Sequence, residues 1–145
     1  YFRGHSLTVE GEDLPWVGAS GCEGLSAIKV RLGQSELKKS CRIKLYFCEP
    51  ENISDGERVF DISVQGESVL QEFDIRQAAG GSNRVVVRSF ESGAVEDAVN
   101  VSFAARKGQP LLSGVEVLMG TSASRTGNRL TPWQHLQALP SNRRN

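Results

Sequence analysis

Alternation of apolar and polar residues constrains the fold of this chain more than any other feature. From Cys41 to Phe47, every odd-numbered residue is apolar, and the residues between them are charged or amphipathic. Because successive side chains of a strand point to opposite faces, this rhythm predicts a strand with one core face and one outer face. The same rhythm recurs in four further segments: Ala27–Leu32, Phe60–Val64, Val99–Phe103 and Val115–Val117.

Turn-forming residues separate these predicted strands. Gln65 and Gly66 are typical of a tight hairpin. Gly80–Asn83 and Lys107–Pro110 are typical of loops that precede a strand. No helical pattern between the strands is long enough for a parallel crossover. We therefore predict an all-β fold, an antiparallel β-sandwich, over residues 1–119.

Residues 120–145 are predicted to form a basic linker and tail. From residue 121 onwards this segment holds four arginines and no acid, and Gly120–Asn128 is small and polar like a linker. Thr131-Pro132 is typical of a helix start, so a short helix is expected over residues 131–139. Such a helix is too short to be stable alone. We expect it to pack on the domain or on a partner through residues on one side: Trp133, Leu136 and Leu139.

Composition argues against several classes of protein. The 17 basic and 17 acidic residues cancel, whereas nucleic-acid binders normally carry a basic excess. No apolar run approaches the roughly 20 residues that cross a bilayer. The chain also begins without Met and without a signal-like apolar run. We expect it to be a piece of a longer protein, with any export signal outside the piece.

The three cysteines do not indicate a disulfide framework, because their number is odd. Cys41 and Cys48 lie seven residues apart in one predicted strand, so their side chains point to opposite faces and cannot pair. Cys22 could bridge to either of them. Buried free thiols are the preferred interpretation.

Motifs for catalysis are missing from the sequence. His5 and His135 are the only histidines, and each lies near a terminus, where a Ser-His-Asp triad is hard to build. There is no zinc motif and no glycine-rich phosphate loop. A glycosidase needs only two carboxylates, and the 17 acids leave that option open by number alone. We predict a protein that is not an enzyme and has no cofactor and no metal.

Five short motifs in the middle of the chain give a more specific indication. In order and spacing they resemble the malectin family: Leu45–Glu49, Arg58–Ile62, Val64–Gly66, Phe73–Ile75 and Gly114–Val117. The segment Trp16–Gly24 resembles the start of bacterial proteins that carry malectin-like domains. The resemblance implies a jelly-roll-like sandwich that binds carbohydrate. It further implies an accessory module of a larger bacterial protein, located outside the cytoplasm: periplasmic, at the cell surface or secreted.

The residues that bind sugar in the family are not retained. Its loop aromatics would fall at Glu51 and Asn52, and the stretch 107–110, where the family has an acid, has none. Substitutes are available. Trp16 and Tyr46 could stack on a sugar, although Trp16 could instead seal the sandwich end and Tyr46 simply cover the sheet. Polar atoms to hold hydroxyl groups would come from four loop residues and one glutamine: Glu49, Glu51, Asn52, Asp55 and Gln109.

Other interpretations of these residues stay open. The acidic loop 48–57 could be plainly solvated or could bind calcium through oxygen atoms. Phe60 and Phe73 fall on inward positions and are expected in the core. Asp61 and Asp74 are expected to accept backbone N–H bonds from neighbouring loops.

Two functions follow from the sequence. The first is a carbohydrate-binding module. The second is a structural or protein-interaction domain that has lost its sugar site and docks a neighbour through the Trp133 helix.

Overall fold

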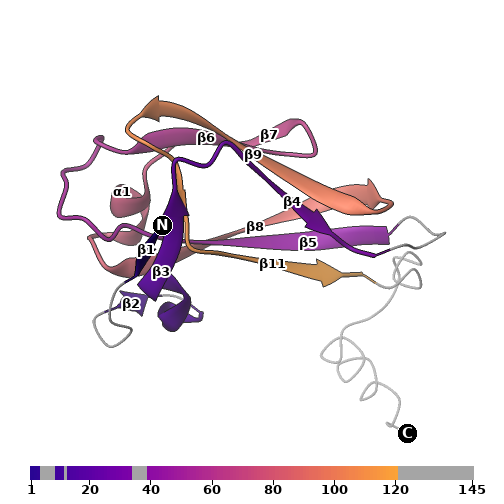
Figure 1. The fold of residues 1–145 in the computed structure, drawn as a ribbon, viewed down its shortest axis with the longest axis horizontal. Coiled ribbons are helices and arrows are strands. Elements are labelled where there is room, and N and C mark those ends of the chain that lie inside the picture. The colour runs from indigo at the N-terminus through magenta and orange to yellow at the C-terminus, as the bar shows by residue number, and fades with distance from the viewer. Residues whose placement is uncertain (4–8, 12, 34–38, 121–145) are drawn as a thin grey trace, which may run out of the picture.

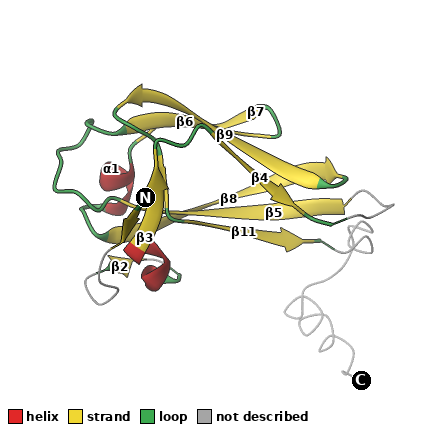
Figure 2. Ribbon diagram, in the orientation of Figure 1, coloured by secondary structure: helices red, strands yellow, loops and turns green. Residues whose placement is uncertain are grey.

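Two facing sheets and a small third sheet make up the fold. The computed structural model describes residues 1–3, 9–11, 13–33 and 39–120. Figure 1 shows the two larger sheets lying one above the other, and Figure 2 shows that strands dominate the described part. The predicted linker and helix of residues 120–145 lie outside it, apart from Gly120. The predicted β-sandwich is confirmed.

One large sheet has the strand order β11-β5-β8-β2. Its strands are Gly114–Met119 (β11), Lys39–Cys48 (β5), Arg84–Val95 (β8) and Glu10–Gly11 (β2). The other has the order β4-β9-β6-β7. Its strands are Ala27–Arg31 (β4), Ala98–Lys107 (β9), Val59–Val64 (β6) and Glu67–Phe73 (β7). Among the described pairs, all but β2 with β8 are antiparallel.

The small sheet closes one end of the sandwich (Figure 1). It has the order β1-β3-β10, with strands Phe2–Arg3 (β1), Ser20–Glu23 (β3) and Leu111–Leu112 (β10). Two short helices complete the described elements: a 3-10 helix over Pro15–Ala19 (η2) and an α-helix over Ile75–Ala79 (α1). Within the described ranges, no helix is long and apolar enough to span a membrane.

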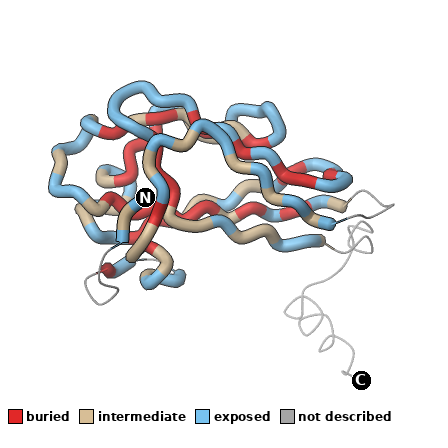
Figure 3. The backbone as a smooth tube through the Cα atoms, viewed as in Figure 1, coloured by how far each residue is buried: buried red, intermediate tan, exposed pale blue. Residues whose placement is uncertain are grey.

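The core lies between the two large sheets, where Figure 3 shows the buried segments. The inward residues of β5 are fully or almost fully buried, as are those of β6 and β9, which confirms the predicted rhythm. Phe60 and Phe73 lie in this core, and their ring centroids are 5.8 Å apart. The rhythm is weaker in β11, where Val115 is 37% exposed and Glu116 is half-buried. The reason is that β11 is an edge strand, with a neighbour on one side only.

A second cluster of apolar residues lies on the opposite face of β5 and β8. Tyr46 points to this outer face, as predicted, but it is only 2% exposed. Its ring packs with Val9, Cys48 and Val85. Its hydroxyl group lies 3.0 Å from carboxylate oxygens of both Asp13 and Glu116. The possibility that Tyr46 lines a groove is therefore wrong, because Val9, Asp13 and Val17 cover the sheet there.

The hairpin at Gln65 and Gly66 forms as predicted, and the structure adds a short helix that we did not predict. Gln65 and Gly66 join β6 to β7 with φ angles of 52° and 84°, the left-handed conformation that a tight hairpin needs. Helix α1 begins after Asp74, whose side chain caps it, and ends at Gly80 with φ of 82°. In the sequence, Asp74 and Gly80 are typical of the start and the end of a helix and could have indicated it.

All three cysteines are free thiols, which confirms the preferred interpretation of their state. Cys41 and Cys48 are buried. Cys22 is exposed on β3, so the prediction that it is buried is wrong.

Candidate functional site

A buried ion pair joins the two large sheets at one end of the sandwich. Glu49 directly follows β5, Arg58 directly precedes β6, and they are 0% and 6% exposed. Arg58 Nε donates to Glu49 Oε2 at 2.5 Å, and Nη2 lies 3.3 Å from Oε1. A buried charge is costly unless it is paired and hydrogen-bonded, and here each charge satisfies the other.

The remaining donors of Arg58 hold three further groups. Nη1 donates to the backbone oxygen of Gln109 at 2.7 Å, and Nη2 donates to Glu23 at 2.8 Å. Nη2 also lies 3.5 Å from a carboxylate oxygen of Glu51. Burial opposes the charge of the guanidinium group, but the bonds and charges of Glu49 and Glu23 outweigh it and raise the pKa of Arg58. Arg58 therefore stays charged and ties together segments that are far apart in the sequence.

The acidic loop 49–57 is anchored to the body of the domain at both ends. At its start, the Glu51 backbone N–H donates to Glu49 Oε1 at 3.1 Å, and Ser82 Oγ donates to the Glu51 carbonyl oxygen at 2.7 Å. At its end, the Gly56 N–H donates to Asp74 Oδ2 at 2.5 Å. This last contact confirms the role predicted for Asp74. Asp61 takes the corresponding role elsewhere, since it accepts from the Glu72 N–H at 2.8 Å.

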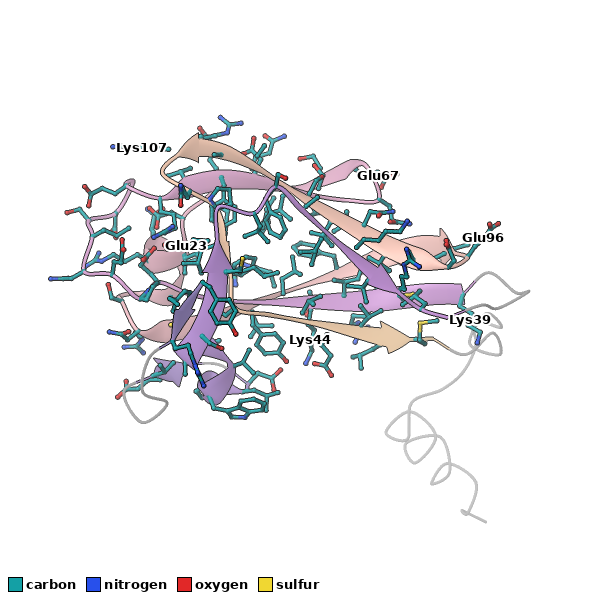
Figure 4. The ribbon with its side chains drawn as sticks, in the orientation of Figure 1. Glu23, Lys39, Lys44, Glu67, Glu96 and Lys107 are labelled. Carbon is teal, nitrogen blue, oxygen red and sulfur yellow. The ribbon has the colours of Figure 1, made fainter. Side chains whose placement is uncertain are left out.

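An open hollow of about 350 Å³ lies above this pair. Three acidic residues line it, Glu23, Glu51 and Glu57, and none of the seven lining residues is aromatic. The full lining comprises Glu23, Glu51, Ile53, Glu57, Arg58, Gly108 and Gln109. Figure 4 labels Glu23 at this end of the molecule and Lys39 and Glu96 at the opposite end. The hollow offers hydrogen-bond acceptors through its three glutamates, while each nitrogen of Arg58 already donates to a group of the protein.

The structure brings together only some of the predicted site residues. Glu51 and Gln109 line the hollow. Glu49 lies beneath it and is fully buried, so the prediction that its carboxylate is free to hold a hydroxyl group is wrong: Arg58 occupies it. Asn52 is exposed on the same loop, next to Glu51. Asp55 pairs with Arg76 at 2.5 Å.

The predicted aromatic contacts are not part of the hollow. Trp16 is 64% exposed on helix η2, so it does not seal the end of the sandwich, but it does not line the hollow either. Tyr46 is buried on the outer face of β5. Within the described ranges, no three His, Cys, Asp or Glu side chains are grouped so that they could hold a metal ion.

Three charged residues of the site were not predicted from the sequence: Glu23, Glu57 and Arg58. The sequence does indicate that Arg58 points inward, because it lies in the same every-second-residue series as the inward residues Phe60, Ile62 and Val64. Glu49 is likewise indicated as inward, because it continues the inward series of β5 by one step. Glu23 reaches the hollow from another sheet, through the pairing of β3 with β10, and its position in the sequence does not indicate this.

Asp74→Ala should loosen the loop that carries Glu51 and Glu57. The change removes acceptors for the Gly56 and Gln77 N–H groups, and the loss of such a helix cap costs about 1–2 kcal/mol. Urea unfolding would measure this loss, and hydrogen exchange would show faster exchange in residues 50–57. Asp74→Asn keeps an acceptor oxygen and serves as the control. Equal effects of the two changes would contradict this role for the carboxylate.

Comparison with known proteins identifies the family of this chain. The sequence profile of the malectin domain matches residues 40–115, just over half of the 145 residues. The chain belongs to the malectin domain family. This confirms the family predicted from the five motifs.

Solved structures with a similar fold include ectodomains of Arabidopsis thaliana and a beta-glucuronidase of Bacteroides uniformis. The ANX1 ectodomain of Arabidopsis thaliana matches with a TM-score of 0.67 and 12% identity, over 83% of this chain and 39% of that one. The ANX2 ectodomain matches with a TM-score of 0.65 and 13% identity, over 83% and 40%. A beta-glucuronidase of Bacteroides uniformis matches with a TM-score of 0.64 and 15% identity, over 77% and 13%.

These likenesses concern the fold alone, because identity is low. The malectin-like chain spans well under half the length of each of these structures. No curated protein matches it significantly.

Proposed function

We propose that this malectin domain is a non-catalytic module that binds carbohydrate in the hollow above Arg58. It would serve as an accessory part of a larger exported bacterial protein, outside the cytoplasm. The observation that supports this proposal most is the hollow itself: at one end of a sandwich of the malectin family, an anchored loop presents carboxylates around a space of about 350 Å³. Loops on a rigid sheet scaffold are where binding usually takes place.

The chemistry of the hollow suits a ligand rich in hydroxyl groups. The Glu51 and Glu57 carboxylates accept hydrogen bonds from sugar hydroxyls, and Gln109 adds a polar group at the rim. Each nitrogen of Arg58 already donates to a group of the protein, so its main role is to position Glu23 and Glu51. Since the described lining has no aromatic ring to stack on a sugar face, we expect weak affinity.

Glu51→Gln should weaken binding of neutral glucan oligosaccharides by roughly tenfold or more, because a hydrogen bond to a charged group is worth about 1.5–3 kcal/mol. Calorimetric titration of the full chain would measure this loss. Glu67→Gln on β7 is the matched control, since Glu67 is exposed and does not line the hollow. The same titration of Trp16→Ala with long polysaccharides tests whether the exposed Trp16 ring remains a contact for a longer ligand. Binding unaffected by Glu51→Gln would refute the hollow as the site.

The second candidate is a protein-interaction domain that has lost the sugar site. It is favoured by the lack of aromatic residues around the hollow and by the burial of Tyr46. Failure of every neutral glycan to bind, together with release of a protein partner by Trp133→Ala, would favour this function over the first.

A further inference from the structure

An apolar groove runs along one open edge of the sandwich, away from Arg58. It has a volume of about 520 Å³ and lies between β3 and β4 on one side and β10 and β11 on the other. Strands β4 and β11 are edge strands of the two large sheets, and both lie at the front in Figure 1. Most of the wall is apolar, with side chains from six residues: Leu25, Ala27, Ile28, Val30, Leu112 and Val115.

The groove exposes side chains that belong to the core face. Val115 lies opposite Leu45 in the β11–β5 pairing, and Leu45 is fully buried. Val115 therefore points to the inner side of its sheet, yet it remains 37% exposed. Ile28 and Val30 alternate in the same way on β4 and are only half-buried. The core is left uncovered along this edge.

A polar atom in the groove also lacks a partner. The Oγ of Ser113 is buried and makes no hydrogen bond within the described part of the chain, and Ser113 lines the groove. Buried hydroxyl groups are normally hydrogen-bonded, and an exception calls for an explanation. A ligand that brings apolar surface and one hydrogen-bond donor would satisfy this edge once the Ser113 side chain turns toward the groove.

The chain itself carries such a segment beyond the described residues. Residues 121–145 follow β11 directly and contain Trp133, Leu136 and Leu139 at helical spacing. The indole N–H of a tryptophan is a donor. From Gly120 back to Val115 is about 17 Å along the strand, and residues 121–132 can span about 40 Å when extended. The segment can therefore reach the groove of its own domain, at a high effective concentration.

We infer that residues 131–139 dock in this groove of the same chain and cover the open edge of the core. Trp133 and the two leucines supply the apolar surface, and the Trp133 indole supplies a donor that Ser113 Oγ accepts when its side chain turns toward the groove. The segment, too short to be stable alone, gains its stability from this contact. The inference does not depend on the hollow above Arg58, which lies elsewhere and has different walls.

Cys22 provides a natural probe, because it is exposed and lines the groove while Cys41 and Cys48 are buried. We expect Leu136→Cys to form an intramolecular disulfide with Cys22 under mild oxidation at least about tenfold faster than Gln134→Cys. Gln134 is the matched control, because it lies two residues before Leu136 and therefore on the opposite side of the predicted helix. Equal rates would overturn the inference. So would disulfide-linked dimers whose yield rises with protein concentration, since they would indicate a second copy as the occupant.

A second measurement uses the full chain without a new cysteine. Alkylation of Cys22 should be roughly tenfold faster in Trp133→Ala than in the unaltered chain, because removal of the indole opens the groove. Arg143→Ala in the same tail is the control and should leave the rate unchanged. Since Trp133 lies outside the sandwich strands, an unchanged unfolding transition of the strands would show that the domain stays folded. A rate of Cys22 alkylation that is the same in all three chains would refute docking.

Discussion

Arg58→Met is expected to lower the free energy of unfolding by about 3–5 kcal/mol, the usual effect of removing one partner of a buried ion pair. The methionine replaces most of the volume of the arginine but none of its charge. Glu49 would keep its place at 0% exposure with no cation beside it. Its carboxylate would also lose the bond from Arg58 Nε. Urea unfolding followed by circular dichroism would measure the change.

Two further variants separate the charge effect from lost packing. Glu49→Leu combined with Arg58→Met removes both charges, so the double variant should regain a large part of the stability lost in Arg58→Met. Arg42→Met is the matched control, because Arg42 pairs with Glu91 at the surface, where the two side chains are 58% and 63% exposed. A surface pair is worth about 0–1 kcal/mol. A loss in Arg58→Met as small as that in Arg42→Met would contradict the importance of the buried pair.

The same arginine connects stability to the proposed binding site. Its contacts hold Glu23 from β3, Glu51 from the acidic loop and Gln109 from the turn before β10. These three residues line the hollow, so we expect its shape to depend on the contacts of Arg58. We expect a variant without this cation to lose the shape of the hollow before it loses the sandwich.

Much of the sandwich could be predicted because its signals are local. The alternation from Cys41 to Phe47 fixes which face of β5 is buried, and Gln65-Gly66 fixes the β6–β7 hairpin. Whether the outer face of a sheet is covered depends on segments that are distant in the sequence, so the strand itself does not indicate it. Tyr46 is buried because Val9 and Val17 from a distant segment pack on it, and nothing in the sequence around Tyr46 indicates this.

The candidate site was harder to predict because it depends on which strand ends meet. The sequence predicted the acidic loop but assigned the same role to each of its glutamates. Counting in steps of two along the strands distinguishes Glu49 from the others, because it continues the inward series of β5. Arg58 continues the inward series of β6 in the same way, so both charges fall on the core face. Two opposite charges on facing inward positions at the same end of a sandwich predict a buried pair. Glu23 could not be found in this way, because it joins the site through the small third sheet.

Phe60→Ala is expected to lower the free energy of unfolding by about 3–5 kcal/mol, through lost burial and the cavity left behind. Phe60 is fully buried, and its ring centroid lies 6.1 Å from that of Phe47 in the facing sheet and 6.2 Å from that of Phe103. Phe90→Ala is the control, because Phe90 is only partly buried, and should cost less. Similar losses in the two variants, measured by urea unfolding, would contradict this central role for Phe60.

We expect the cavity in Phe60→Ala to weaken the packing around Arg58 as well. Phe60 is an inward residue of β6 and lies two residues from Arg58, which directly precedes that strand, and neighbouring residues usually couple by about 0.5–3 kcal/mol. Phe60→Ala combined with Arg58→Met should therefore cost measurably less than the sum of the two single changes, because the first change already loosens the packing that positions the guanidinium group. Strict additivity would mean that the aromatic core and the ion pair stabilise the two sheets independently. In that case the hollow would depend on its own polar contacts and not on the core beneath it.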